Sequence, residues 1–192
     1  MDLLKIVSKQ YPLDKKYIPM GLMHEPIANT WIIEDVYYQF YSLNKELQKN
    51  GLSSLQIISG YRSYEYQRLL YNQSIRRSLL FNRDAELAAR QTEESITLQG
   101  CSEHQLGVAI DVTTSCLWHL EDPFGEFEQT FQLRWLLKNS INYGFILRYP
   151  RHKTHITGVK YKPYHFRYVG ISHAKKMKKL DLCLEEYKNI YF

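Results

Sequence analysis

The stretch CSEHQLGVAIDVT, residues 101–113, decides the fold class expected for this sequence. Gly107 permits a turn, and apolar and polar residues then alternate as they do in a β-strand with one face in a core. Asp111 lies on the face opposite the apolar residues. His104 comes just before the turn, so its imidazole could fold back over the face that carries Asp111. The stretch therefore predicts a strand that brings a carboxylate and an imidazole together.

A second strand is predicted in YHFRYVG, residues 164–170, where alternation places His165 and Phe166 on opposite faces. If the two strands are neighbours, His104, Asp111 and His165 converge on one point. Two imidazoles and one carboxylate with an open fourth position form the ligand set of catalytic rather than structural zinc.

Spacing alone leaves a plainer interpretation open. A buried aspartate is commonly a hydrogen-bond acceptor at a strand end, and a buried histidine is commonly a satisfied core residue. The H-x6-D spacing is also less specific than a compact metal-binding motif such as HExxH.

The rest of the chain predicts an α+β fold, with a small central antiparallel sheet that carries the candidate site and helices that flank it. No repeat, linker or low-complexity tract is visible, so residues 1–192 are expected to form one domain. Apolar spacing predicts helices over 31–51, 64–80, 83–95, 130–144 and 171–192, and strands over 55–63, 107–114, 145–149 and 164–170.

Composition and charge limit the kinds of molecule that the protein is expected to bind. The formal net charge is +5, and part of it lies in HAKKMKK (173–179), which is typical of a solvated helix face; a nucleic-acid partner is therefore not expected.

No apolar run approaches the roughly 18 residues of a membrane span, and the N-terminal residues do not resemble a signal peptide. Three cysteines without paired spacing favour a reducing compartment, so the predicted location is cytoplasmic. Oligomeric state is left open.

Four blocks occur in an order and separation that resemble a known family: SGYRS (59–63), GCSEHQLGVAIDV (100–112), YGFILRYP (143–150) and KPYHFRYVG (162–170). They are similar to D-alanyl-D-alanine carboxypeptidases of the VanY type and to the VanXY dipeptidase/carboxypeptidases of vancomycin resistance. This zinc peptidase group also includes lysostaphin-like enzymes and the hedgehog signalling domain. The resemblance implies a Zn²⁺-dependent hydrolase for peptides that end in D-Ala-D-Ala, or for the free dipeptide.

The resemblance also implies roles for individual residues. His104, Asp111 and His165 would bind zinc. Arg62 would stabilise the oxyanion as the peptide carbonyl becomes tetrahedral, with a surface salt bridge in the turn as the alternative.

Four further positions are expected to contact substrate. Gln67 and Ser102 would hydrogen-bond the terminal D-residue, although either alone would pass for an ordinary polar helix or cap residue. Arg148 is a candidate for the substrate carboxylate, with a structural ion pair as the equal alternative. Tyr164 stands where the family usually carries Trp, and keeps an aromatic ring beside the last metal ligand.

One position departs from the family pattern. Three residues before the last histidine the family carries the catalytic Glu, which takes a proton from the attacking water and returns it to the leaving amine; here Lys162 stands there, and Pro163 prevents a shift of register. Loss of a general base costs roughly 10² to 10⁴ in rate. An ammonium about 5 Å from the metal also opposes zinc by about 3 kcal/mol at an effective dielectric constant of about 20. Glu103 is not expected to replace the base.

Two functions therefore remain open. The chain is either a zinc D,D-peptidase whose activity is impaired by Lys162, or a catalytically inactive relative that keeps the fold to bind a peptide or protein partner.

Overall fold

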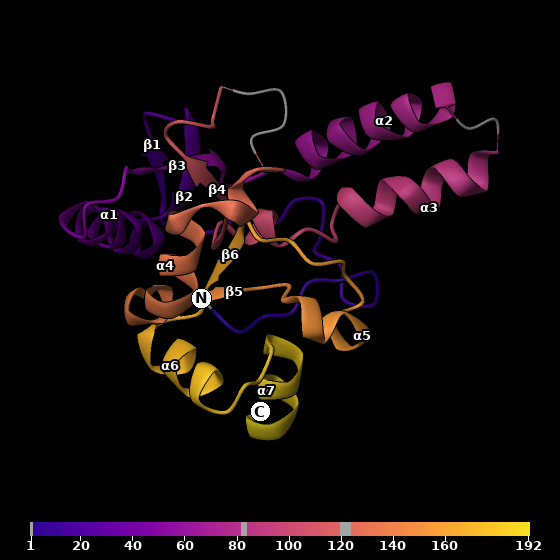
Figure 1. Ribbon diagram of the computed structural model, residues 1–192. Coiled ribbons are helices and arrows are strands. Elements are labelled where there is room, and N and C mark those ends of the chain that lie inside the picture. The colour runs from indigo at the N-terminus through magenta and orange to yellow at the C-terminus, as the bar shows by residue number, and fades with distance from the viewer. Residues whose placement is uncertain (1, 82–83, 120–123) are drawn as a thin grey trace.

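The computed structural model describes residues 2–81, 84–119 and 124–192 (Figure 1). The first residue of the helix expected over 83–95 lies outside the described residues.

A four-stranded antiparallel sheet forms the centre, in the order β3-β4-β6-β5. The strands are β3 (Leu55–Ser59), β4 (Ala109–Thr114), β5 (Phe145–Leu147) and β6 (His165–Tyr168). Asp111 of β4 lies directly opposite Ser59 on one side and His165 on the other. The prediction that the strands around 107–114 and 164–170 are neighbours is thereby confirmed.

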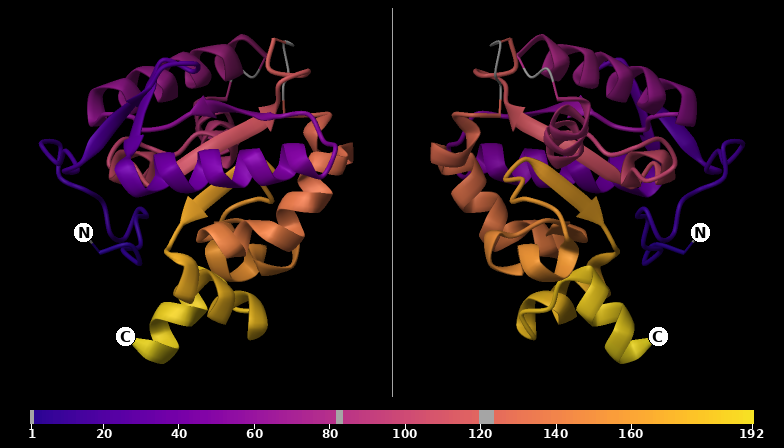
Figure 2. Two further views of the ribbon diagram at one scale, coloured as in Figure 1. Left: turned by 90° about the vertical axis from the view of Figure 1, so that its left-hand side faces the viewer. Right: turned by 90° about the vertical axis from the view of Figure 1, so that its right-hand side faces the viewer.

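One face of this sheet packs on helices α1 (Glu34–Lys49) and α4 (Phe131–Asn139), and Figure 2 shows α1 lying across it. The apolar spacing expected in α1 is present, since four of its residues enter the core: Val36, Phe40, Leu43 and Leu47. They meet Ile110, Val112 and Phe166, which are the apolar-face residues expected of the two strands.

The opposite face of the sheet is also covered. Helices α2 (Tyr64–Phe81) and α3 (Ala85–Ser95) form an antiparallel hairpin beside it (Figure 1), and Ile96 and Thr97, directly after α3, line the same cavity as Asp111 and His165. All six residues of β4 are consequently buried. The polar face of β4 thus lines an enclosed site instead of facing bulk water.

Several features differ from the sequence prediction. The helix expected over 31–51 begins only at Glu34, and the helix expected over 130–144 ends at Asn139 and is followed by a 3₁₀ turn. A hairpin of β1 (Leu22–Glu25) and β2 (Thr30–Ile33) was not foreseen. The helix expected over 171–192 is two helices, α6 (Ile171–Lys179) and α7 (Leu184–Tyr191). The break has a local cause, because Cys183 starts α7 in a capping box with Glu186.

Short helical segments complete the chain: α5 (Thr154–Thr157) and the 3₁₀ turns η1 (Glu103–Leu106), η2 (Phe127–Gln129), η3 (Ser140–Tyr143) and η4 (Arg151–Lys153). Among the described residues, no helix is both long and apolar enough to cross a membrane. The α+β fold with a small antiparallel sheet between helices is confirmed.

Candidate active site

Three side chains converge as the sequence predicted. His104 comes from η1, Asp111 from β4 and His165 from the first position of β6, and all three are buried. His104 Nε2 lies 3.1 Å from Asp111 Oδ2, and His165 Nδ1 lies 2.8 Å from Asp111 Oδ1. One ligand atom from each residue lies within 4.8 Å of the others. Two imidazole nitrogens and a carboxylate oxygen at this spacing fit a zinc ion.

His104 is oriented by backbone from two directions. Gly107 ends η1 with φ 72°, a conformation that suits glycine, and so turns the chain into β4. The carbonyl oxygen of Gly60 lies 2.7 Å from His104 Nδ1 and can only accept, so Nδ1 carries the proton and the Nε2 lone pair faces Asp111. Burial, with the nearby Arg62 guanidinium, lowers the pKa of His104 to about 4, so the imidazole is neutral at pH 7.

Asp111 is held in its ionised form. Burial alone would raise the pKa of its carboxyl, but His104, which is protonated in the acid range where this carboxyl would titrate, holds that pKa well below its usual range. Arg62 also donates from Nη2 to Asp111 Oδ2 at 2.7 Å, and from Nε to Ser59 Oγ at 2.7 Å. Arg62 therefore points into the site, and the alternative of a surface salt bridge does not describe it.

A cavity of about 300 Å³ opens beside these groups. Its described lining is Arg62, Leu70, Ser95, Ile96, Thr97, Cys101, Ser102, Glu103, His104, Asp111, Phe124, Tyr149, Val159, Lys162, Tyr164 and His165. Ser102 is buried in this wall, directly before η1. The Tyr164 ring stacks on Phe124 with centroids 3.9 Å apart, so two aromatic rings form part of the cavity wall.

Gln67 lies behind the cavity wall. Its side chain is buried on α2; Nε2 donates to the carbonyl oxygen of Thr97 at 2.8 Å, and Oε1 lies 3.5 Å from Arg62 Nη1. In this geometry Gln67 fixes the segment over the site and supports Arg62. Direct contact between Gln67 and a substrate stays a prediction.

Arg148 is committed to a buried ion network. Its Nε donates to Glu103 Oε1 at 2.8 Å, and its Nη1 donates to Glu185 Oε2 at 2.9 Å. Arg148 is 2% exposed and is absent from the described cavity wall. The geometry thus agrees with the structural ion pair that the sequence left open; Arg148 borders the neighbouring cavity of about 550 Å³, and its contact with a substrate carboxylate stays a prediction.

Lys162 lies at the cavity, at the position expected for the missing base. Its Nζ donates to the carbonyl oxygen of Ser95, the last residue of α3, at 2.9 Å, and lies 6.0 Å from the centre of the Tyr149 ring. Burial lowers the pKa of this amine, with Asp111 opposing the shift. The side chain is half-buried, and it ties the chain before β6 to the end of α3.

Two residues of the site were not assigned a role from sequence. The Tyr149 ring stacks on His165, with centroids 5.1 Å apart and planes 27° apart. Glu103 is buried, and its Oε2 lies 3.7 Å from His165 Nε2. Burial would raise the pKa of Glu103, but Arg148 and Arg167 hold it well below its usual range. In the sequence, Glu103 stands next to the ligand His104, and Tyr149 lies in the family-like block 143–150, but neither position indicated a role.

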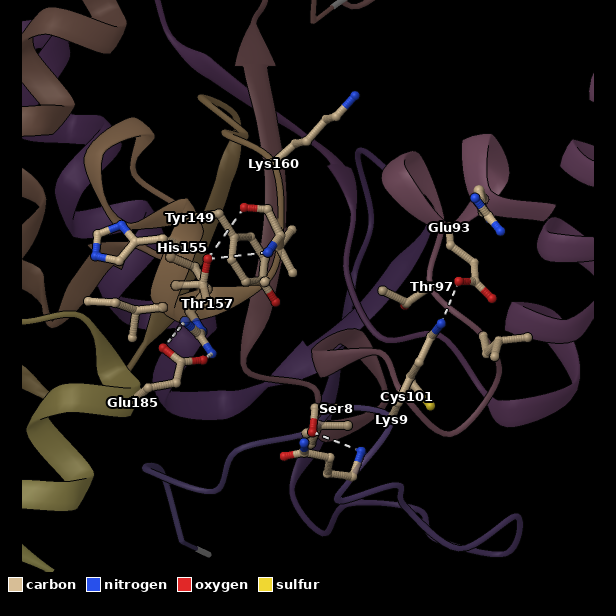
Figure 3. A pocket seen from close by; sticks show the side chains of 18 residues that line it. Ser8, Lys9, Glu93, Thr97, Cys101, Tyr149, His155, Thr157, Lys160 and Glu185 are labelled. Carbon is tan, nitrogen blue, oxygen red and sulfur yellow. Dashed lines mark hydrogen bonds and ion pairs between the residues drawn. The ribbon is translucent and has the colours of Figure 1, made fainter. Parts of the chain in front are cut away.

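A second cavity of about 550 Å³ adjoins the first and shares Thr97, Cys101, Tyr149 and Val159 with it. Figure 3 shows one wall of this second cavity, where Lys9 of the N-terminal segment reaches Glu93 of α3 beside Thr97 and Cys101. A ligand longer than the first cavity could therefore extend between the two spaces.

Comparison with known proteins identifies the family. Residues 29–171 match the family model described as VanY, D-alanyl-D-alanine carboxypeptidase. The chain belongs to the VanY family. The family resemblance drawn from the four sequence blocks is confirmed, and members of the VanY family are peptidases.

Similar proteins in the VanY family match over almost the whole chain. The bifunctional D-Ala-D-Ala dipeptidase and carboxypeptidase VanXYC of Enterococcus gallinarum is 33% identical over 97% of this chain and 94% of its own length. The structure of VanYB in complex with D-alanine-D-alanine superposes with a TM-score of 0.85 at 31% identity, covering 98% of each chain. A VanY mutant from the VanB-type resistance cassette, solved with Zn(II), superposes with a TM-score of 0.84 at 32% identity, covering 98% of this chain and all of that one.

Proposed function

We propose that this chain is a Zn²⁺-dependent D,D-peptidase scaffold for D-Ala-D-Ala, either as the end of a peptidoglycan precursor or as the free dipeptide, with turnover impaired by Lys162. The observation that carries the proposal is the convergence of His104, Asp111 and His165 beside Arg62 in the wall of one cavity. A VanY relative that binds D-alanine-D-alanine and another that binds Zn(II) support it.

Each group at the site has its own proposed role in the reaction. When bound, zinc would polarise the scissile carbonyl and make water a stronger nucleophile at neutral pH. Arg62, already fixed by Ser59 and Asp111, offers a guanidinium to the carbonyl oxygen as negative charge develops there. Ser102 on the wall, with Gln67 behind it, would orient the terminal D-residue.

In the family pattern a Glu stands where this chain has Lys162, and that Glu takes the proton from the attacking water. Lys162 presents an amine there, and this amine donates to the carbonyl oxygen of Ser95 instead of accepting a proton. We expect binding to survive and the proton transfer to fail, since a missing general base costs roughly 10² to 10⁴ in rate.

The test is Lys162→Glu. D-Ala release would be measured from D-Ala-D-Ala and from a pentapeptide that ends in D-Ala-D-Ala, with zinc-loaded protein. We expect a rise of about 10² to 10⁴ over the unchanged chain. Lys175→Glu is the matched control, because it makes the same charge change at an exposed position that lines neither cavity, and it should leave the rate unchanged. Equal activity of the unchanged chain and Lys162→Glu would show that Lys162 does not disable the site.

The second candidate function is recognition without hydrolysis. The bond from Lys162 to Ser95 favours it, because this bond ties two walls of the cavity together without providing a base. Calorimetry with D-Ala-D-Ala would separate the two proposals. Tight binding by the unchanged chain, combined with no turnover by Lys162→Glu, would favour a binding protein over an impaired peptidase.

The site of action proposed for the chain is the cytoplasm, where peptidoglycan precursors and the free dipeptide are made available. The three cysteines are free, which fits a reducing compartment, and one of them, Cys183, is buried. Fractionation of cells that express the intact protein would test this location.

A further inference from the structure

Two buried polar atoms beside the candidate metal site face each other. Glu103 Oε2 and His165 Nε2 both lack a hydrogen-bond partner within the part of the chain that the structure describes, and they are 3.7 Å apart. A buried polar group without a partner is costly, so such a pair calls for an explanation. Closing the gap to an ordinary 2.9 Å hydrogen bond needs a movement of about 0.8 Å.

The other carboxylate oxygen of Glu103 is already used. Oε1 accepts from Arg148 Nε at 2.8 Å and pairs with Arg167 Nη1 at 3.2 Å. Arg167 is itself anchored by the backbone carbonyl oxygens of Leu3 and Lys5. The two arginines therefore hold Glu103 by Oε1, which leaves Oε2 aimed at the imidazole.

The opposite edge of that imidazole faces the metal site. His165 Nδ1 lies 2.8 Å from Asp111 Oδ1, and the Tyr149 ring stacks on the face of the imidazole. Stacking fixes the plane of the ring but does not choose which nitrogen carries the proton. The group that faces Nε2 determines which of the two ring nitrogens carries the proton.

We infer that Glu103 is a positioning residue for the metal ligand His165. Its Oε2 accepts the hydrogen bond from His165 Nε2–H, and so fixes the tautomer whose Nδ1 lone pair is directed at the metal. This inference rests on the proposed zinc site and adds a residue to it. Glu103 is not a substitute for the missing base, because it lies on the edge of the imidazole away from Asp111 and is held there by two arginines.

Glu103→Gln tests the inference with almost no change of shape. Arg148 and Arg167 only donate, so they will turn the amide oxygen toward themselves, and the amide NH₂ then meets His165 Nε2–H. Two donors face each other, and the zinc-binding tautomer loses its support. We expect zinc affinity, measured by competition with a chelator, to fall by about 10- to 100-fold.

Glu185→Gln is the matched control. It removes one carboxylate from the same arginine network, since Glu185 pairs with Arg148, but it does not touch His165. Its zinc affinity should stay within about twofold of the unchanged protein. An equal loss in both variants would overturn the inference, because the effect would then come from the network's charge and not from the bond to His165.

A measurement on the unchanged chain keeps the inference testable even if Glu103→Gln does not fold. In zinc-loaded protein with ¹⁵N-labelled histidine, His165 should show a slowly exchanging, downfield Nε2–H proton in the NMR spectrum, as a bond to a carboxylate requires. A proton on Nε2 that exchanges rapidly with water would overturn the inference. Failure of the chain to take up zinc at all would overturn the zinc site as well, which distinguishes the two proposals.

Discussion

His104 and His165 present different ring nitrogens to the same carboxylate. His104 uses Nε2, because Nδ1 is bound to the carbonyl oxygen of Gly60, and His165 uses Nδ1. Each choice is set by what lies behind the ring and not by the residue type. Lys162 adds a second positive group to that of Arg62, a half-buried amine near a site whose ligands suit a cation.

The lowered pKa of His104 predicts how the metal-free protein responds to acid. The folded-state pKa is about 4, whereas an unfolded histidine titrates near 6.5, so between these values the unfolded chain binds more protons. Stability therefore falls as pH drops from about 6.5 to 4, by on the order of 2–3 kcal/mol from this residue, and is unaffected by it above 6.5.

Denaturant unfolding with a chelator present, at several pH values across this window, would measure the effect. His104→Gln should flatten the slope, and His155→Gln, at an exposed position, should leave it unchanged. The same slope in His104→Gln as in the unchanged chain would contradict a neutral buried imidazole.

The elements place the ligands through close backbone contact. β3 ends at Ser59, and Gly60 then passes beside the β2 strand, where a Cβ atom would lie 2.6 Å from the Trp31 carbonyl oxygen and 2.7 Å from Ile32 Cγ2. The same glycine supplies the acceptor for His104. The close approach of Gly60, directly after β3, to strand β2 thus sets the position of a metal ligand in η1.

Gly60→Ala should therefore affect both stability and metal binding. Overpacking of this kind costs about 1–3 kcal/mol, and movement of the Gly60 carbonyl would loosen His104 and weaken zinc binding. Gly158→Ala is a useful comparison: no atom lies within 4 Å of its added Cβ, although φ is +67°. It should cost roughly 1–2 kcal/mol in backbone strain and leave zinc affinity unchanged. Unchanged zinc affinity in Gly60→Ala would contradict the proposed anchoring of His104.

Across the whole molecule, one buried ion network joins parts that are distant in sequence. Arg148 after β5 binds Glu103 of η1 and Glu185 of α7, and Arg167 of β6 reaches the N-terminal segment at Leu3. The network links both ends of the chain to the site. It also explains why α7 packs near the sheet, at the end of the molecule farthest from α2 (Figure 1).

Breaking the network should lower the free energy of unfolding by several kcal/mol. Arg148→Met leaves two carboxylates without their main partner, and loss of one partner of a buried pair costs about 3–5 kcal/mol. Arg151→Met removes an exposed pair with Glu128 and should cost no more than about 1 kcal/mol. Chemical denaturation of both variants measures the difference, and similar losses in the two would argue against a structural role for Arg148.

Local patterns in the sequence determined much of this protein. Alternation gave the faces of β4 and β6, apolar spacing gave α1, and the residue types His104, Asp111, His165 and Lys162 gave the chemistry to expect. These features depend on neighbours one to four residues apart, which is why sequence reasoning reaches them. The VanY-like blocks added Arg62, and the structure places it beside Asp111.

Only the tertiary structure decided the rest. Arg148 meets Glu103 across 45 residues of chain, and Arg167 reaches the carbonyl oxygen of Leu3 across 164. Such contacts depend on which strands pair and how helices pack over them, and no local pattern encodes either. For that reason the sequence left the role of Arg148 open, and the bond from Glu103 toward His165 became visible only when η1, β5 and β6 were folded against one another.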